Sequence, residues 1–261
     1  MRIASLQPSI TVTLDRLGRL DTLCACTKYC LDVVPSLRGS SIQILHDSWQ
    51  ANTEEILAAK ADLVIASVPY RMESLAAILK AGVPVIALAP RSLSDIYHDI
   101  HLIASVVNAT EAGCALVREM QHAVEAAQML TRSAPRPHVY CEEWGKPLIH
   151  SQGWVAELVH AAGGDFLGGP GSTTAAEAIA DLDPDVLLFA WCGAGDRVPM
   201  QRVIEQRDWQ HLRAVQQKNV YCIPDEFLNT PASTLLEGLA CLGNAIHPSL
   251  FPAHARLLRL N

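Results

Sequence analysis

Residues 54–66 read Glu-Glu-Ile-Leu-Ala-Ala-Lys-Ala-Asp-Leu-Val-Ile-Ala, a helical stretch that leads into a short apolar run. The chain repeats this arrangement later, because Glu177-Ala-Ile179 is followed at the same spacing by Asp185-Val-Leu-Leu-Phe-Ala190. In both places a Glu-x-Ile-x5-Asp pattern joins a helix to a buried strand, as in folds built from parallel strands and crossover helices. The two copies predict two lobes built on one plan.

Short apolar runs alternate with helical stretches along the rest of the chain. They predict strands over residues 2–6, 22–27, 62–67, 84–89, 138–142, 185–191 and 219–223. Strands separated by helical stretches are typical of parallel sheets. We therefore expect an α/β fold with Rossmann-like lobes and mostly parallel sheets.

Two helices are predicted in the middle of the chain, over 94–107 and 111–131. The second contains no proline, and the segment 131–137 ends it because proline cannot continue a helix. At 1.5 Å per residue the second helix is about 30 Å long, enough to bridge two lobes. We expect two lobes joined by this single long α-helix: an N-terminal α/β lobe at 1–109, a linker helix at 110–131 and a C-terminal α/β lobe at 132–261.

The composition is that of a packed globular protein. Of the 261 residues 50% are hydrophobic and 18% are charged, and the formal net charge is −7. Nucleic acids and anionic membranes bind proteins through clustered Lys and Arg, and this chain carries a net negative charge, so we expect neither as a partner. No run of about 18 apolar residues is present, so no bilayer-spanning segment is expected.

The compartment is left open by the sequence. The chain opens directly into the strand-like Arg2–Leu6 without a secretory signal, and its eight cysteines are too few for a disulfide scaffold. As written, these features favour the cytoplasm. A trimmed mature form would instead be periplasmic or otherwise extracytoplasmic.

Aromatic and polar residues are common in the loops after the predicted strands. Open parallel sheets bind ligands beyond the carboxyl ends of their strands. Aromatic faces with a few polar groups suit a large, flat, partly apolar ligand, whereas rings that plug the lobe interface are the alternative. The candidate ligand-binding residues are Gln7, Pro8, Ser9, Tyr29, Trp49, Tyr70, Trp144, Trp191, Cys192, Asp225 and Asn229.

Signatures of catalysis are missing from the sequence. It has no Gly-x-Ser-x-Gly, no P-loop, no Gly-x-Gly-x-x-Gly after the first strand and no His-Glu-x-x-His. Gly168–Ser172 before a helix can cradle an anion, although a plain turn is its commoner meaning. Thr174 with Glu177 has the pattern of a capping box, and Asn52 can cap in the same way with Glu55. We predict no catalytic residue.

Cysteines and histidines offer few metal ligands. Cys24 and Cys26 point to one face of an alternating strand, so we expect small hydrophobes there rather than zinc ligands. Cys30 and Cys192 fall in predicted strand-end loops, where a thiolate can ligate a metal or a thiol can pack against a ligand. Surface histidines are the plainer interpretation of the remaining candidates, His46 and His150. We expect no metal site and no required cofactor.

Motifs of one family are spread nearly end to end along the chain. They are Arg2-Ile-Ala-Ser-Leu-Gln-Pro-Ser9, Thr27-Lys-Tyr29, Ser48-Trp49-Gln50, Asn52-Thr-Glu54-Glu-Ile56, Asp62-Leu-Val-Ile-Ala66, Gly82-Val-Pro-Val85, Ser92-Leu-x-Asp-Ile96 and Asp225-x-Phe227. With them the chain resembles the substrate-binding proteins of ABC importers for cobalamin, iron-siderophores and haem. The resemblance implies two α/β lobes, a single connecting helix and ligand capture without catalysis.

The resemblance also implies roles for individual residues. Tyr29, Trp49 and Asp225 match positions that contact the corrinoid in cobalamin-binding members, and Trp144 matches a further aromatic of that pocket. The family docks on its permease dimer through one acidic residue per lobe. Two carboxylates on matching lobes can engage arginines of a two-fold permease, which fixes orientation more than affinity. In this sequence, the residues at those positions are Glu54 and Glu177.

The chain departs from the cobalamin pattern at three positions. Ser67 and Gly171 stand where the best-known cobalamin binders have tryptophan, and Trp191 has no clear equivalent there. We expect a non-enzymatic binder of a corrinoid in the cleft between the lobes. The alternatives are binding of haem or an iron-siderophore, or a cytosolic corrinoid or metal chaperone or enzyme that uses a cysteine or histidine.

Overall fold

The computed structural model describes residues 1–46 and 52–260 of the chain. The chain divides into two compact units, Met1–Glu119 and Met120–Asn261. The division falls inside the long helix α6 (Thr110–Thr131), which is one of the two helices predicted from the sequence. The exact lobe and linker bounds 1–109, 110–131 and 132–261 remain a prediction.

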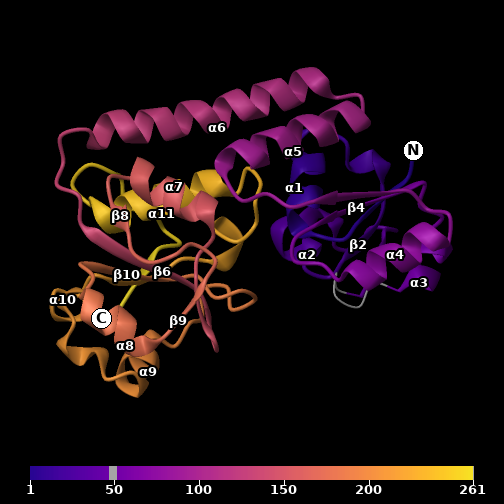
Figure 1. Ribbon diagram of the computed structural model, residues 1–261. Helices are drawn as coiled ribbons and strands as arrows, with labels where there is room; N and C mark the ends of the chain where they lie inside the picture. Colours follow the sequence, from indigo (N-terminus) through magenta and orange to yellow (C-terminus); the bar gives the residue numbers. More distant parts are fainter. Residues whose placement is uncertain (47–51, 261) are drawn as a thin grey trace. The chain divides into compact units, whose positions relative to one another are not determined.

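The first unit is built around a five-stranded sheet in the order β3-β2-β1-β4-β5, and all four of its pairings are parallel. Figure 1 shows two of these strands, β2 and β4, with the helices of this unit around them. Each strand is followed by a helix, as the sequence pattern predicts. The elements are β1 (Ile3–Ser5), α1 (Pro8–Arg16), β2 (Leu23–Thr27), α2 (Cys30–Val33), β3 (Gln43–Leu45), α3 (Thr53–Ala58), β4 (Leu63–Ser67), α4 (Met72–Lys80), β5 (Val85–Leu88) and α5 (Leu93–Val106).

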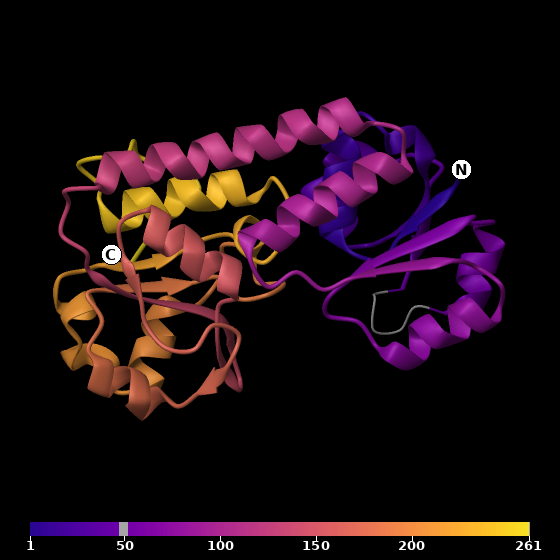
Figure 2. The same cartoon turned by 45° about the horizontal axis from the view of Figure 1, so that its top comes forward.

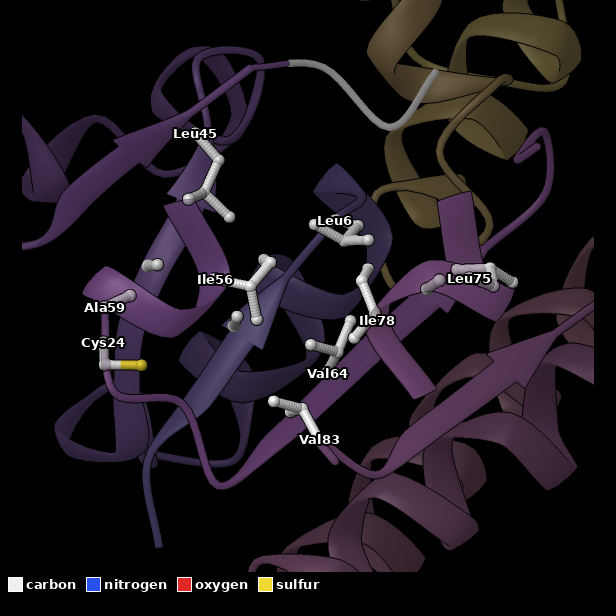
Figure 3. Close-up of a cluster of buried hydrophobic side chains, with 12 residues drawn as sticks. Leu6, Cys24, Leu45, Ile56, Ala59, Val64, Leu75, Ile78 and Val83 are labelled. Atoms are coloured by element: carbon white, nitrogen blue, oxygen red, sulfur yellow. The ribbon is translucent and has the colours of Figure 1, made fainter. Parts of the chain in front are cut away.

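Helices cover both faces of this sheet. On one face, Ile56 of α3 and Ile78 of α4 pack with Val64 of β4 and Leu6 in a fully or nearly fully buried cluster (Figure 3). On the other face, α1 packs against α2, α5 and the sheet. Because both faces are covered, the three central strands β1, β2 and β4 are buried along their whole length and read as continuous apolar runs.

The second unit contains a mixed sheet in the order β12-β11-β10-β6-β7-β9, with β8 paired to β6. β8, β6, β10 and β11 pair in parallel, while β7, β9 and β12 pair antiparallel. The elements are β6 (His138–Gly145), β7 (Leu148–His150), α7 (Gly153–Ala161), β8 (Asp165–Phe166), β9 (Thr173–Thr174), α8 (Ala176–Leu182), β10 (Val186–Phe189), α9 (Met200–Gln206), α10 (Arg213–Gln216), β11 (Val220–Cys222), α11 (Leu235–Ile246) and β12 (Leu258–Arg259).

This sheet is also covered on both faces, as Figure 2 shows. Helices α7 and α11 pack against each other on one face. On the other face, Trp209, Tyr140 and Phe189 belong to a buried cluster to which α8, α9 and α10 contribute. Both units are therefore α/β with parallel strands at their centres, which confirms the predicted fold class.

The seven predicted strands and two predicted helices are all present. The strands that the sequence pattern missed are β3, β7, β8, β9 and β12. None of them is buried along its whole length, so none has the continuous apolar run that reveals β1 and β11, which are equally short. Among the described residues, no helix combines the length and the apolar composition needed to cross a membrane.

The predicted capping box in the second unit is wrong. Thr174 lies in β9, where it pairs with Leu148 of β7, and the residue before α8 is Ala175, which makes no side-chain cap. Gly168–Ser172 accordingly leads into this short strand rather than directly into a helix. Pairing with a distant strand overrides the local capping pattern here.

Candidate functional site

In the first unit, the candidate ligand-binding residues follow three neighbouring parallel strands, β2, β1 and β4. The carboxyl ends of these strands meet at one edge of the sheet. The Gln7 amide links two of the loops there, since its Nε2 donates to the Pro69 carbonyl at 3.1 Å. The candidates at this edge are Gln7, Pro8, Ser9, Tyr29 and Tyr70.

These residues differ in accessibility. Tyr29 is 41% exposed, and the Lys28 ammonium lies 5.0 Å from the centroid of its ring. Tyr70 is half-buried and packs against the core cluster of α3 and α4, while Ser9 is buried in α1. Tyr29 is thus the aromatic ring that this edge presents most openly among its described residues.

Trp49 lies outside the described residues. Of the described residues that flank this gap in the chain, Glu55 accepts the backbone N–H of His46 at 3.1 Å and contacts the His46 ring, which is mostly exposed. Asn52 caps α3 by accepting the backbone N–H of Glu54 at 2.9 Å. Asn52 therefore caps as predicted, but Glu55 pairs with His46 instead of completing a capping box.

In the second unit, the candidates lie at or beyond the carboxyl ends of β6, β10 and β11, which are adjacent and parallel. Trp144 lies near the carboxyl end of β6, is 42% exposed, and donates from Nε1 to the Lys146 carbonyl at 2.6 Å. Trp191 and Cys192 follow β10, and the remaining candidates follow β11. These are Asp225 and Asn229.

Trp191 is half-buried and packs against the core of the second unit. Its Nε1 donates to Oε1 of Glu142 at 2.8 Å, and its ring meets the edge of Phe189 with centroids 6.3 Å apart. A Cβ added to Gly145 would lie 2.4 Å from the indole, so the backbone of β6 runs directly against the ring. The position of Trp191 is fixed by its neighbours in this unit.

The loop after Trp191 is also held by hydrogen bonds. The two carboxylate oxygens of Asp225 accept the backbone N–H groups of Gly193 and Gly195, each at 2.8 Å. Nδ2 of Asn229 donates to the Ala190 carbonyl at 2.6 Å and lies 3.3 Å from the Cys192 sulfur. Asp225 and Asn229 thus brace this loop, in addition to any contact with a ligand.

Cys192 is poorly suited to reactive chemistry. Desolvation raises the pKa of the Cys192 thiol, and the nearby carboxylates of Glu143 and Asp225 raise it further. A thiol that resists ionisation is a weak nucleophile and a weak metal ligand. Cys30 was expected in a strand-end loop but is the first residue of α2, where it is fully buried and its sulfur lies 3.4 Å from Oγ1 of Thr27.

His150 is buried rather than exposed, so its interpretation as a surface histidine is wrong. Its ring lies edge-on to Tyr140 and beside Phe166, and desolvation lowers its pKa. Its Nδ1 has no hydrogen-bond partner among the residues described. Gly168, with φ +90°, passes so close that any Cβ there would overlap the ring. These contacts and the lowered pKa indicate that the His150 imidazole is neutral and packs in the core against Gly168.

The two acidic residues predicted to dock on a permease occupy the same local position in each unit. Glu54 is the second residue of α3, and Glu177 is the second residue of α8. Both residues are exposed, whereas the isoleucines two positions later, Ile56 and Ile179, are buried. Each helix therefore anchors through its isoleucine and presents its glutamate to solvent.

Sequence reasoning missed one functional candidate group, the buried ion pair of Glu142 and Arg207. Glu142 lies inside β6, and Arg207 donates to both of its carboxylate oxygens at 2.8 and 2.9 Å. A carboxylate next to a buried strand signals the need for a partner. Arg207 lies 65 residues away in sequence, so only the folded chain identifies it.

Comparisons with known proteins agree with this architecture. The model of the periplasmic binding protein family matches residues 3–227. An uncharacterized ABC transporter substrate-binding lipoprotein, YvrC of Bacillus subtilis, is 25% identical over 96% of this chain and 81% of its own length. A cobalamin-binding protein of Halobacterium salinarum is 24% identical over 94% of this chain and 69% of its own length.

Solved structures share the fold. A periplasmic heme binding protein from Pseudomonas aeruginosa superposes with a TM-score of 0.87 over 100% of this chain and 98% of its own, at 19% identity. At this identity the likeness concerns the fold alone.

The family resemblance expected from the sequence motifs is confirmed, since the family model covers most of the chain. This chain belongs to the periplasmic binding protein family.

Proposed function

We propose that this chain binds a corrinoid, a cobalamin-like ligand, and delivers it unchanged to the permease of an ABC importer. One observation carries the proposal: in each unit an exposed aromatic ring stands at the carboxyl end of a parallel strand. These rings are Tyr29 after β2 and Trp144 at the end of β6. Large rings exposed at the ligand-binding edge of a sheet offer flat apolar faces to a macrocycle.

The chemistry around the rings suits a ligand of low charge. The exposed cationic side chains in the described strand-end loops stand alongside several carboxylates; they are Lys28, Arg71, Arg91, Lys146 and Arg197. The Arg207 guanidinium is already paired with Glu142. Ferric siderophore complexes are commonly anionic and need unpaired guanidinium or ammonium groups. A corrinoid, whose rim carries neutral amides, fits these loops better.

Relatives support delivery to an importer. The Bacillus subtilis relative is named as an ABC transporter substrate-binding lipoprotein, and the Halobacterium salinarum relative as a cobalamin-binding protein. By analogy, this chain works on the outer side of the cytoplasmic membrane and is a carrier rather than an enzyme. It docks through Glu54 and Glu177, the exposed carboxylates at matching positions of the two units.

Haem is the second candidate ligand, favoured by the accessible phenol of Tyr29. A tyrosine oxygen is an established axial ligand for haem iron, and an exposed phenol at the sheet edge can approach the metal. Haem also has a flat apolar face. Its two propionates, however, need cationic partners, and the cations of these loops stand alongside several carboxylates.

Ligand titration tests the proposal. Purified protein is titrated with cyanocobalamin, hemin and a ferric hydroxamate siderophore in separate calorimetric and absorbance experiments. We expect one corrinoid per chain with a Kd of about 1 μM or tighter, and a weaker response to the other ligands. Failure to bind cyanocobalamin at 100 μM overturns the proposal. Stoichiometric hemin binding with a shifted Soret band would assign the site to haem.

A further inference from the structure

Glu142 is completely buried, and four hydrogen bonds converge on its carboxylate. Oε2 accepts from the Tyr140 hydroxyl at 2.6 Å and from Arg207 at 2.8 Å. Oε1 accepts from Arg207 at 2.9 Å and from Nε1 of Trp191 at 2.8 Å. A buried carboxylate with this many donors is satisfied and confined to one geometry.

Arg207 is confined as well. Its side chain is 10% exposed, and its guanidinium carbon lies 4.7 Å from the centroid of the Trp209 ring. Trp209 is itself fully buried and donates from Nε1 to the Ala176 carbonyl at 3.1 Å. The guanidinium is therefore clamped between a carboxylate and an indole that belong to the rigid core.

Trp191 is the only member of this network that also lies in a strand-end loop carrying ligand-binding candidates. Its indole is oriented from three sides, by the Glu142 oxygen, by the edge of Phe189 and by the backbone of Gly145. Binding a flat ligand against a ring that is already oriented costs little ordering entropy. Through Glu142, the buried core thus holds the Trp191 indole in one orientation.

We propose that Glu142 and Arg207 are positioning residues that set the orientation of the Trp191 indole for contact with a flat ligand. This inference rests on the proposed function. A purely structural ion pair would stabilise the second unit without reference to Trp191. A positioning pair acts on the ligand through the Trp191 ring, so its effect on affinity disappears when that ring is altered.

A double-mutant cycle separates the two roles. The variants are Arg207→Met, Trp191→Phe and the two combined, with Arg207→Lys as a milder change that keeps the charge opposite Glu142. We expect Arg207→Met to weaken cyanocobalamin binding about tenfold when Trp191 is present and less than twofold in the Trp191→Phe background. Arg207→Lys has the same pattern with a smaller factor. An equal loss in both backgrounds overturns the inference.

The matched control is Arg213→Met. Arg213 also forms a close ion pair in this unit, with Asp183 at 2.7 Å and Asp185 at 2.8 Å, but it has no contact with Trp191. We expect its affinity for cyanocobalamin to match that of the wild type. A loss equal to that of Arg207→Met would show a general effect of breaking an ion pair and would also overturn the inference.

A readout without ligand keeps this test separate from that of the proposed function. The near-ultraviolet circular dichroism of Trp191 is obtained as the difference between wild type and Trp191→Phe. In the Arg207→Met background, the same difference is taken between Arg207→Met and the double variant Arg207→Met, Trp191→Phe. We expect this difference to vanish while the far-ultraviolet spectra stay native. If the wild type binds no corrinoid, the proposed function is refuted, but this measurement still tests whether Glu142 and Arg207 orient the Trp191 indole. An unchanged Trp191 band in a folded Arg207→Met variant contradicts it.

Discussion

Asp62 and Asp185 make the same contact in two different units. Oδ2 of Asp62 accepts the backbone N–H of Arg2 at 2.7 Å, and Oδ2 of Asp185 accepts the backbone N–H of His138 at 2.8 Å. Each aspartate also donates its own backbone N–H to the carbonyl of the same partner, at 2.8 and 2.9 Å. The aspartates thus join the starts of two neighbouring parallel strands in each unit.

The likeness extends to the backbone before each aspartate. Lys60 and Asp183 both adopt left-handed conformations, with φ of 51° and 41°, and each stands two residues before its aspartate. Few non-glycine residues adopt this conformation, so the shared position is informative. The helix, turn and strand of the two units are therefore built alike, which makes Glu54 and Glu177 equivalent positions.

Removing both exposed glutamates should abolish delivery and leave ligand binding intact. We expect Glu54→Ala or Glu177→Ala alone to reduce transport about fivefold, since one exposed ion pair contributes about 1 kcal/mol. The double variant should be inactive, because both attachment points are lost. Uptake of labelled cyanocobalamin by cells that carry the importer measures the effect.

A suitable control for the docking prediction is Glu73→Ala. Glu73 is exposed and is also the second residue of its helix, α4, but it has no counterpart in the internal repeat. Its removal should leave uptake unchanged. Normal transport by the Glu54→Ala, Glu177→Ala double variant would refute docking through these residues.

Trp144→Ala should weaken corrinoid binding about tenfold, because the variant loses the contact between the exposed indole and the ligand. We expect that contact to contribute about 1.4 kcal/mol to the binding free energy. Calorimetric titration with cyanocobalamin gives the affinity. Leu182→Ala is the matched control, since Leu182 is also an exposed apolar side chain of the second unit but lies at the end of α8. Equal affinities of wild type and Trp144→Ala would remove Trp144 from the site.

Asp99→Asn should stabilise the protein at neutral pH. Desolvation in α5, with the charge of Asp95 second, raises the pKa of Asp99 to about 6. The folded protein therefore bears the cost of an ionised, half-buried carboxylate above pH 6. We expect the variant to gain about 1–2 kcal/mol in free energy of unfolding at pH 7.5.

The gain from Asp99→Asn should shrink as the pH falls. Below about pH 6 the folded wild type binds a proton that the unfolded chain, with an ordinary carboxyl pKa, does not yet bind, so the wild type regains stability. The difference should be nearly gone at pH 4. Urea denaturation at pH 7.5, 5.5 and 4 provides the comparison, and a pH-independent difference would be the opposing result.

Gly168→Ala should destabilise the second unit by about 2–3 kcal/mol, because φ of +90° disfavours a side chain and the new methyl would overlap the buried His150 ring. Urea denaturation measures the loss. Gly169→Ala is the control, since its Cβ would meet chiefly the Ser172 side chain. Similar free energies of unfolding for the two variants would show that the His150 ring can move away from the new methyl at little cost, which would contradict the prediction.

The positions of the strand-end loops were predictable because these loops follow directly from the buried strands. The apolar runs before Gln7, Tyr29 and Trp191 are plain in the sequence, and within each unit parallel pairing brings the residues after such runs to one edge of that unit's sheet. What individual side chains do there was not predictable. The contact of Asp225 with a ligand stays a prediction, whereas the hydrogen bonds of both its oxygens to the backbone N–H groups of Gly193 and Gly195 had no signal in the sequence.

The sequence by itself determined the α/β class, the central strands, the two middle helices and the internal repeat. Those features follow from local periodicity and spacing, which act over a few residues. Only the tertiary structure decided that Glu142 pairs with Arg207, that His150 is buried against Gly168, and that Thr174 joins a strand instead of capping a helix. Burial and pairing join residues far apart along the chain, so their energies depend on neighbours that local sequence does not specify.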